Sequence, residues 1–224
     1  MTAGPRGVTP VQIARRIAAD IPDGSYVNLG IGLPTLVADA VAPGKEIVYH
    51  SENGVLGFGP APADGEGDPE LINAGKQPVT LLPGGAYFHH TDAFVMMRGG
   101  HLDVTVLGAF QVSERGDLAN WATDEAAMPP AVGGAMDLAV GAKRVLVMTT
   151  HTTRDGRPKL MSACTYPLTA AAVVDRIYTD LAVLDVVADG FLVRELVPGV
   201  SPAELQALTA ADLRFADDLT VLGD

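Results

Sequence analysis

One carboxylate in this sequence lies where a reactive group is expected, after an apolar segment and before a glycine-rich loop. Glu52 follows the β-forming segment 47–49 and precedes Asn53 and Gly54, two residues that tolerate the positive φ of a sharp turn. In open α/β sheets, ligands and reacting groups gather at the carboxyl ends of strands. A desolvated glutamate held there can act as a nucleophile, although an isolated turn glutamate is more often simply solvated.

A second group suited to the same chemistry is the pair Gly133 and Gly134, which precedes the apolar segment 135–138. A developing oxyanion needs fixed donors, and backbone N–H groups at a helix start are suitable. Gly134 has no Cβ to block its N–H. Taken alone, the pair is more often a junction that lets a loop pack closely on a helix.

Apolar runs and turn residues predict the elements that would position these groups. Thr9 and Pro10 predict the N-cap and first residue of a helix whose apolar face carries Ile13, Ile17 and Ile21. A hairpin is predicted from 181–187 and 191–196, and Ser201 begins a last short helix. Further strands are predicted at 25–29, 47–49, 79–82, 104–107 and 145–148, and further helices at 34–41, 91–97, 135–140 and 170–177.

This alternation predicts an α/β fold with an open, mostly parallel sheet covered by helices on both faces. The 224 residues suit a single domain, 1–224, because no linker or internal repeat divides them. Residues 59–68 are rich in glycine, proline, alanine and acidic residues and predict a mobile loop beside Glu52.

Composition excludes several classes of protein. Hydrophobic residues make up 48% of the chain and charged residues 19%, as expected for a packed globular protein. The net charge of −12 argues against a nucleic-acid partner. No apolar run is long enough for a membrane span, and residues 1–8 lack the pattern of a signal peptide, so we expect a cytoplasmic protein.

Other candidate sites are weaker. Asn28, Gly30 and Gly32 form a strand-to-helix turn that resembles half of a dinucleotide-binding motif, but Thr35 replaces its third glycine. The single cysteine, Cys164, has no basic partner in sequence and suits a small buried thiol. No spacing of histidine, cysteine or acidic residues suits a metal site, and the adjacent His89 and His90 cannot face the same side of regular structure.

Seven segments in a fixed order carry a more specific signal. From about residue 11 to 219 the chain resembles the B (β) subunit of the family I, 3-oxoacid-type coenzyme A (CoA) transferases, and residues 50–54 resemble that family's active-site signature. The other matching segments are 27–34, 71–76, 82–86, 98–101, 116–121 and 133–138.

The resemblance implies roles for named residues. Glu52 would form a mixed anhydride and then a glutamyl-CoA thioester, and the Gly134 N–H would stabilise an oxyanion. Asn28 and Lys76 match residues near the CoA arm. The expected substrate-binding residues are Asn28, Gly30, Gly32, Asn53 and Lys76.

The resemblance also implies partners. The A (α) subunit would complete an αβ or α2β2 complex, and CoA would be a substrate and covalent intermediate, with no metal or other cofactor. Succinyl-CoA is the expected donor, and acetoacetate or 3-oxoadipate the acceptor. Because the chain's negative charge repels CoA, local donors or the partner must overcome that repulsion.

Two alternatives stay open at the level of sequence. An acyl-CoA hydrolase would use the same glutamate and differ by admitting water. A sugar-phosphate isomerase or ligand-sensing domain would share the fold, because fold alone does not determine function.

Overall fold

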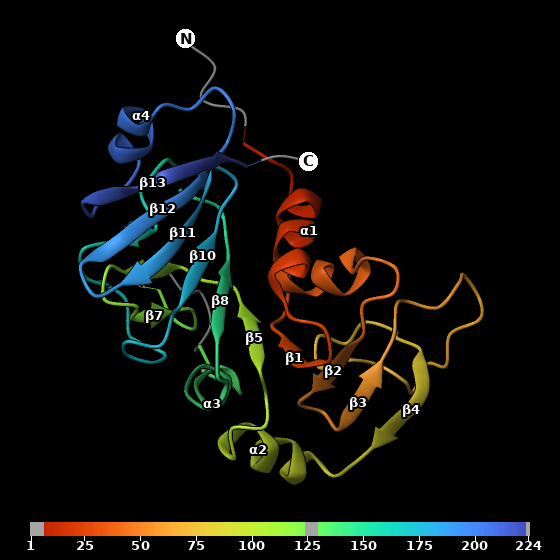
Figure 1. The fold of residues 1–224 in the computed structure, drawn as a ribbon. Helices are drawn as coiled ribbons and strands as arrows, with labels where there is room; N and C mark the ends of the chain where they lie inside the picture. Colours follow the sequence, from red (N-terminus) through yellow and green to blue (C-terminus); the bar gives the residue numbers. More distant parts are fainter. Residues whose placement is uncertain (1–6, 124–129, 223–224) are drawn as a thin grey trace.

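The computed structural model describes residues 7–123 and 130–222 (Figure 1). Most elements begin and end close to the predicted positions. In chain order they are α1 (Pro10–Asp20), β1 (Ser25–Leu29), the 3₁₀ helix η1 (Leu33–Ala40), β2 (Ile47–Ser51), β3 (Val55–Phe58), β4 (Leu81–Tyr87), α2 (His90–Arg98), β5 (Val104–Leu107), β6 (Gln111–Ser113), β7 (Leu118–Ala119), α3 (Ala135–Gly141), β8 (Val145–Met148), β9 (Leu160–Met161), β10 (Arg176–Tyr178), β11 (Ala182–Val187), β12 (Gly190–Leu196), α4 (Pro202–Ala207) and β13 (Leu213–Val221).

Ten of these strands form one sheet in the order β13-β12-β11-β10-β8-β5-β1-β2-β3-β4. The five central strands, β10 to β2 in this order, are parallel, which confirms the predicted parallel core. Toward the edges, the pairs β2–β3, β3–β4, β10–β11 and β11–β12 are antiparallel, whereas the edge strand β13 pairs parallel with β12. For β2–β3 and β11–β12 the reason is connection length, because the links at 52–54 and 188–189 are too short for a parallel crossover.

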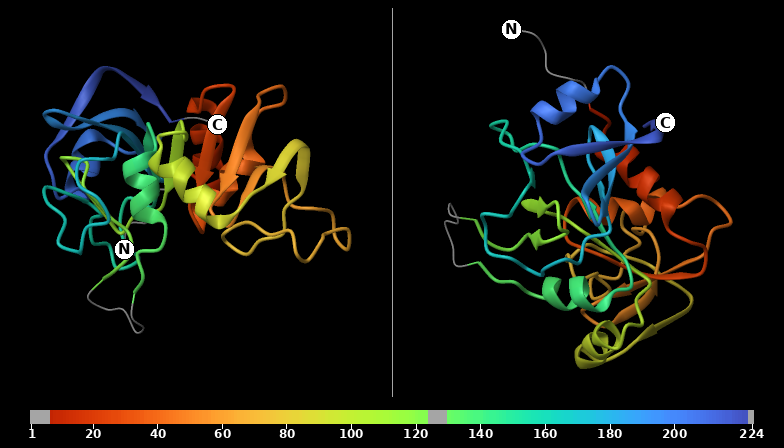
Figure 2. Two further views of the ribbon diagram at one scale, coloured as in Figure 1. Left: turned by 90° about the horizontal axis from the view of Figure 1, so that it is seen from below. Right: turned by 60° about the vertical axis from the view of Figure 1, so that its left-hand side comes forward.

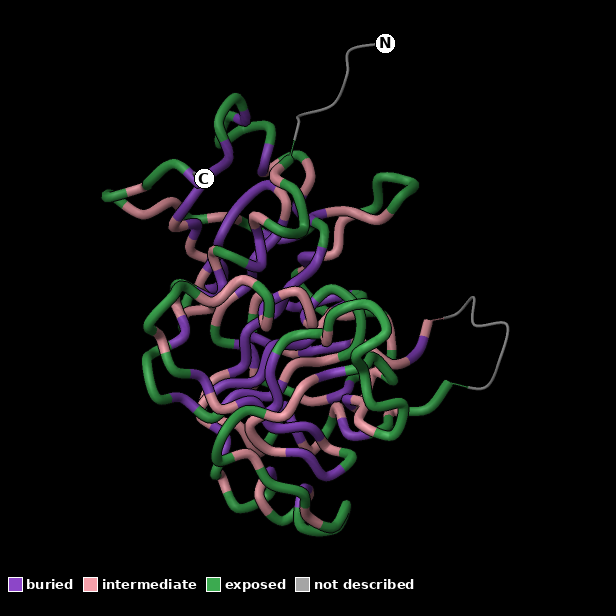
Figure 3. Tube along the Cα trace, turned by 90° about the vertical axis from the view of Figure 1, so that its right-hand side faces the viewer, coloured by how far each residue is buried: buried purple, intermediate pink, exposed green. Residues whose placement is uncertain are grey.

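The two faces of the sheet are covered by different elements. Along β8, Val145 and Val147 point to the cluster that includes residues of α3, α4 and the small sheet β7-β6-β9. Leu146 and Met148 point the other way, to the cluster that includes α1 and η1. This alternation has the two-residue period of a strand. The buried segments of the chain therefore lie in the middle of the molecule, and exposed loops surround them (Figure 3). The helices α2 and α3 pack side by side (Figure 2).

Three predicted elements differ from the structure. The predicted helix 170–177 is wrong: it is an irregular segment leading into β10, and Ala172 has a φ of 53°. The backbone of this segment instead forms hydrogen bonds with the backbone around β7. The Leu118 N–H donates to Ala170 O, and the Val173 N–H donates to Gly116 O. Apolar spacing alone does not separate these two outcomes.

The other two differences concern elements near Glu52. The predicted helix 34–41 is the 3₁₀ helix η1, with Gly32 as its N-cap at φ 88° and no side-chain cap. The predicted core strand 79–82 is wrong as a core element, because β4 is an edge strand, largely exposed, that begins at Leu81. Pro83 fits there because an edge strand can tolerate a missing N–H donor.

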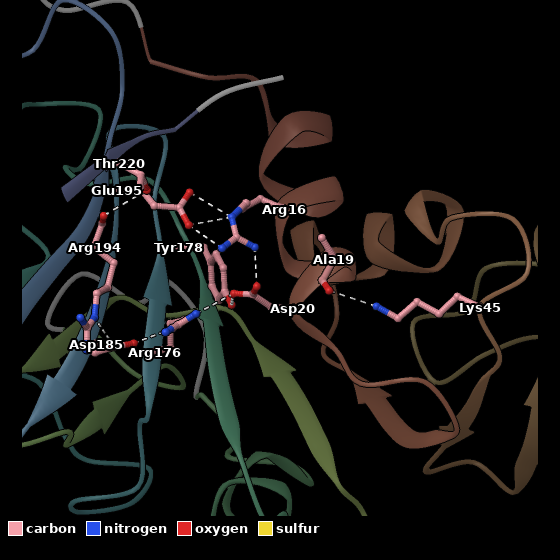
Figure 4. Close-up of polar contacts among 10 residues, drawn as sticks. All are labelled: Arg16, Ala19, Asp20, Lys45, Arg176, Tyr178, Asp185, Arg194, Glu195 and Thr220. Carbon is pink, nitrogen blue, oxygen red and sulfur yellow. Dashed lines mark hydrogen bonds and ion pairs between the residues drawn. The ribbon is translucent and has the colours of Figure 1, made fainter. Parts of the chain in front are cut away.

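A network of charged side chains ties α1 to the sheet (Figure 4). Asp20 accepts hydrogen bonds from Arg16 at 2.5 Å, from Arg176 at 2.7 Å and from the Tyr178 hydroxyl at 2.6 Å. Arg16 also pairs with the buried Glu195 of β12. Burial alone would raise the pKa of Asp20, but these hydrogen bonds outweigh it and hold the pKa below its ordinary value.

We expect Asp20→Asn to lower the free energy of unfolding by about 2–3 kcal/mol, because it leaves two half-buried arginines incompletely paired. Urea denaturation at pH 7 measures this loss. Asp218→Asn is the control, since that side chain is 85% exposed and lies 3.7 Å from Arg194. Equal losses in the two variants would contradict a stabilising role for the network.

Candidate active site

Glu52 lies in the tight turn that joins β2 to β3. Gly54 has a φ of 107°, and a Cβ there would lie 2.2 Å from Phe88 O, so only glycine fits. Asn53 extends from the same turn and donates from Nδ2 to Ile72 O at 2.7 Å. The turn is therefore fixed to the loops on both sides, and the predicted position of Glu52 after a strand is confirmed.

The carboxyl group of Glu52 is half-buried, and burial raises its pKa. The His90 ring nearby opposes this rise, and the Asp137 carboxylate reinforces it. His90 Nδ1 also donates to the Glu52 backbone oxygen at 2.7 Å. A carboxylate with a raised pKa is poorly solvated, which favours its use as a nucleophile.

His90 is a residue that sequence reasoning missed. Adjacency in sequence excludes His89 and His90 as a shared metal site, and the structure gives the two residues separate roles. His89 caps α2 by accepting from the Thr91 N–H, and His90 contacts the Glu52 turn from 38 positions away in the chain. No local sequence pattern reports a contact of this kind.

Gly134 lies directly against the Glu52 side chain. A Cβ built on Gly134 would lie 2.6 Å from Glu52 Oε2 and 3.1 Å from Glu52 Cδ. Gly134 is the N-cap of α3, and Gly133 before it has a φ of 56°. The structure thus brings together two residues that the sequence places 82 positions apart. The oxyanion role of the Gly134 N–H stays a prediction.

These two residues line a cleft of about 500 Å³. Its walls come from the carboxyl ends of four neighbouring parallel strands, where Leu29 ends β1, Glu52 follows β2, Leu107 ends β5 and Met148 ends β8. This is the edge at which open α/β sheets bind ligands, and the volume suits a small organic molecule. The cleft is also lined by Gly30, Ile31, Leu33, Gly108, Phe110, Asn120, Trp121, Thr149 and Lys159.

Comparison with known proteins identifies the family. Residues 11–207 match the family described as coenzyme A transferase. The chain belongs to the coenzyme A transferase family. It is 61% identical over 206 residues to the B subunit of the 3-oxoadipate CoA-transferase of Acinetobacter baylyi, covering 92% of this chain and 95% of that protein.

One further relative supports the same family, and one solved structure supports the fold. The B subunit of the succinyl-CoA:3-ketoacid coenzyme A transferase of Helicobacter pylori is 46% identical and covers 89% of this chain and 96% of its own length. An acyl-CoA transferase of Escherichia coli matches the fold with a TM-score of 0.75 at 20% identity. That match covers 99% of this chain and 44% of the longer E. coli chain. The predicted resemblance and the α/β CoA-transferase fold are both confirmed.

The glycines expected to bind substrate lie in the turn between β1 and η1. Gly30 lines the cleft, and its N–H donates to Val106 O at 2.8 Å. A Cβ at Gly30 would lie 3.1 Å from the same oxygen, so a larger residue would push β1 from β5. Gly32 has open space around it, so a side chain would meet no neighbour, but its φ of 88° is a conformation that favours glycine. Contact of either residue with substrate stays a prediction.

Asn28 is buried, with 3% of its surface exposed, and it supports the strand that carries Glu52. Its Nδ2 atom donates to His50 O at 3.0 Å and lies 3.1 Å from His50 Nδ1. Burial lowers the pKa of His50 to about 4, so this imidazole is neutral at pH 7 and can accept the bond. In this coenzyme A transferase, Asn28 therefore positions β2, and its binding role stays a prediction.

Lys76 is exposed on a turn beside the cleft. It has a φ of 62°, an unusual conformation for lysine. Its turn is attached to β2 because the Ala74 N–H donates to Ser51 Oγ at 2.9 Å. Ala74 lines the cleft, whereas Lys76 is not among its lining residues. Binding of the CoA arm by Lys76 stays a prediction.

Other groups have no evident part in the chemistry. Cys164 is half-buried, and burial raises the pKa of its thiol to about 11, in agreement with an inert structural cysteine. Within residues 7–123 and 130–222, no three histidine, cysteine or acidic side chains come together as a metal site. In the same ranges, no helix has both the length and the apolar character that crossing a membrane requires.

Proposed function

We propose that this chain is the B subunit of a CoA-transferase that moves CoA from succinyl-CoA to a 3-oxo acid, with 3-oxoadipate favoured over acetoacetate. The main support for this reaction type is that the half-buried Glu52 carboxylate lies against Gly134 inside the cleft. The choice of 3-oxoadipate is supported by the relatives, since the one named for it is 61% identical and the one named for 3-ketoacids is 46% identical.

The proposed mechanism uses Glu52 twice. A Glu52 oxygen attacks the thioester carbonyl of succinyl-CoA, the carbon–sulfur bond breaks, and CoA leaves as a thiolate. The thiolate then attacks the glutamyl carbonyl of the mixed anhydride. The bond to the succinyl oxygen breaks, free succinate leaves, and CoA remains on Glu52 as a thioester. The acceptor acid reverses both steps and carries CoA away, without a metal or redox cofactor.

Two features of the cleft support this sequence of steps. The N–H of Gly134 is suited to stabilise the oxyanion that forms at the acyl or glutamyl carbonyl. Both covalent intermediates react with water, so the cleft must be closed during turnover. We propose that an A (α) partner closes it, in an αβ or α2β2 complex, because two relatives named as B subunits match this chain over most of their length.

Trapping the covalent intermediate tests the proposal. The complex of this chain with its α partner, given succinyl-CoA and no acceptor, should add the mass of CoA less one water to Glu52. Peptide mass spectrometry locates the adduct, and borohydride should inactivate the enzyme only after exposure to succinyl-CoA.

The isolated chain is the control and should form no more than a trace of adduct. Rapid release of free CoA without an acceptor would instead identify an acyl-CoA hydrolase. Absence of any reaction with acyl-CoA would favour a binding domain of the same fold.

A further inference from the structure

Lys159 is a cation inside the active-site cleft that the sequence did not indicate. It lies directly before β9 and lines the same cleft as Glu52 and Gly134. Its Nζ atom donates to Thr149 Oγ1 at 2.9 Å. Thr149 is buried, and its hydroxyl donates in turn to Ala109 O at 3.1 Å. The ammonium group is thus held by a neutral acceptor at the carboxyl end of β8.

Among the described residues, no carboxylate lies within ion-pair distance of the Lys159 ammonium group, although the charge of Asp180 acts on it. In the described parts of the chain, Lys159 makes no ion pair, whereas Lys143 pairs with Asp103 at 2.7 Å. Burial lowers the pKa of Lys159, and the charge of Asp180 only partly opposes this. An ammonium group has three donors, and Thr149 takes one. A half-buried cation with free donors is a favourable site for an anion that enters the cleft.

Glu52, the proposed nucleophile, lines the same cleft as Lys159. Lys159 and Glu52 form no ion pair with each other: the Lys159 ammonium group is bonded to Thr149, and the Glu52 carboxyl group lies against Gly134. Apolar and aromatic side chains, including Phe110 and Trp121, line the cleft as well. A ligand that suits this lining has a carbonyl group that can react at Glu52, an apolar part, and an anionic group that Lys159 can bind.

We propose that Lys159 binds the distal carboxylate of a dicarboxylic acyl group while the other end of that group reacts at Glu52. The inference rests on the proposed CoA-transferase function and names the residue that would select dicarboxylic substrates. The flexible four-carbon side chain of lysine would let one ammonium group follow acyl groups of different length.

A pair of acceptors of equal length tests the inference in the complete complex. 3-Oxoadipate and 3-oxohexanoate differ only in whether the sixth carbon is a carboxylate or a methyl group. With succinyl-CoA as the fixed donor, the native enzyme should prefer 3-oxoadipate in kcat/KM by at least tenfold. Lys159→Met should lower kcat/KM for 3-oxoadipate by about 30-fold, which corresponds to ~2 kcal/mol, and change that for 3-oxohexanoate by less than twofold.

Two further variants serve as controls. Lys159→Arg keeps the charge and should recover much of the preference for the dicarboxylate. Lys143→Met removes an exposed lysine outside the cleft and should change neither acceptor's kinetics.

Three outcomes would overturn the inference. In the first, the native enzyme does not prefer the dicarboxylate. In the second, Lys159→Met lowers kcat/KM equally for both acceptors, which would give Lys159 a structural role. In the third, the variant affects succinyl-CoA and butyryl-CoA equally as donors, which would place the ammonium on CoA itself. If the native complex transfers CoA to no acid, the proposed function itself is wrong.

Discussion

Replacing Glu52 by glutamine should lower CoA transfer by the assembled enzyme at least 10³-fold, a loss of about 4 kcal/mol in transition-state stabilisation. The amide keeps the size of the side chain and removes the proposed nucleophile. Folding should not suffer, because the raised pKa of Glu52 means that burying its ionised form is unfavourable, and glutamine carries no charge. Steady-state kinetics and a thermal melt of the same sample separate the two effects.

Two companion variants sharpen this result. Glu46→Gln is the control, because Glu46 is an exposed glutamate outside the cleft and should retain full activity. Glu52→Asp should fail nearly as badly as Glu52→Gln, since it withdraws the carboxylate by more than the ~1 Å that oriented catalysis tolerates. An adduct that persists in Glu52→Gln, or that forms on Cys164, would disprove the glutamyl mechanism.

Adding one methyl group at Gly134 should cost about 10²-fold in kcat. The Cβ of Gly134→Ala would lie 2.6 Å from Glu52 Oε2, so the carboxylate must move by a distance to which catalysis is sensitive. The backbone of Gly134 lies in the right-handed helical region, with φ −80° and ψ −3°, and does not have the positive φ that favours glycine. Alanine is therefore tolerated there, and the stability should stay the same or rise slightly.

Gly108→Ala is the matched control for this prediction. Gly108 lines the same cleft, and a Cβ added there meets no atom within 4 Å. It should lose far less activity than Gly134→Ala. If the two variants lose activity equally, the effect comes from filling the cleft and not from displacing Glu52.

Local sequence signals predicted many of the elements. The pattern at Thr9 and Pro10 predicted the start of α1, and the structure has a full capping box there with Gln12. Ser201 with Glu204 gives the same result for α4. These features succeed because all the interacting atoms lie within one helical turn. The placement of Glu52 depended on a short strand followed by turn residues, which is also local information.

The parts that sequence did not predict depend on contacts between distant segments. The segment before β10 has helical apolar spacing, yet its backbone pairs with residues around β7, and no local pattern reports this pairing. His90 contacts the Glu52 turn through the packing of α2, and Lys159 reaches the cleft because β9 lies beside β6. The ordered family motifs supplied Gly134, whose contact with Glu52 is visible only in three dimensions.

The rigid turn around Glu52 also indicates where this scaffold can acquire new specificity. Gly54 allows no side chain, and Asn53 and the Glu52 backbone are both committed to neighbouring loops. Random mutagenesis of this turn should therefore yield mostly inactive proteins. Phe110, Trp121 and Lys159 also line the cleft, and none of the three has the positive φ that restricts Gly54. A protein engineer who wants this scaffold to accept a different acid should diversify these three positions and leave the turn unchanged.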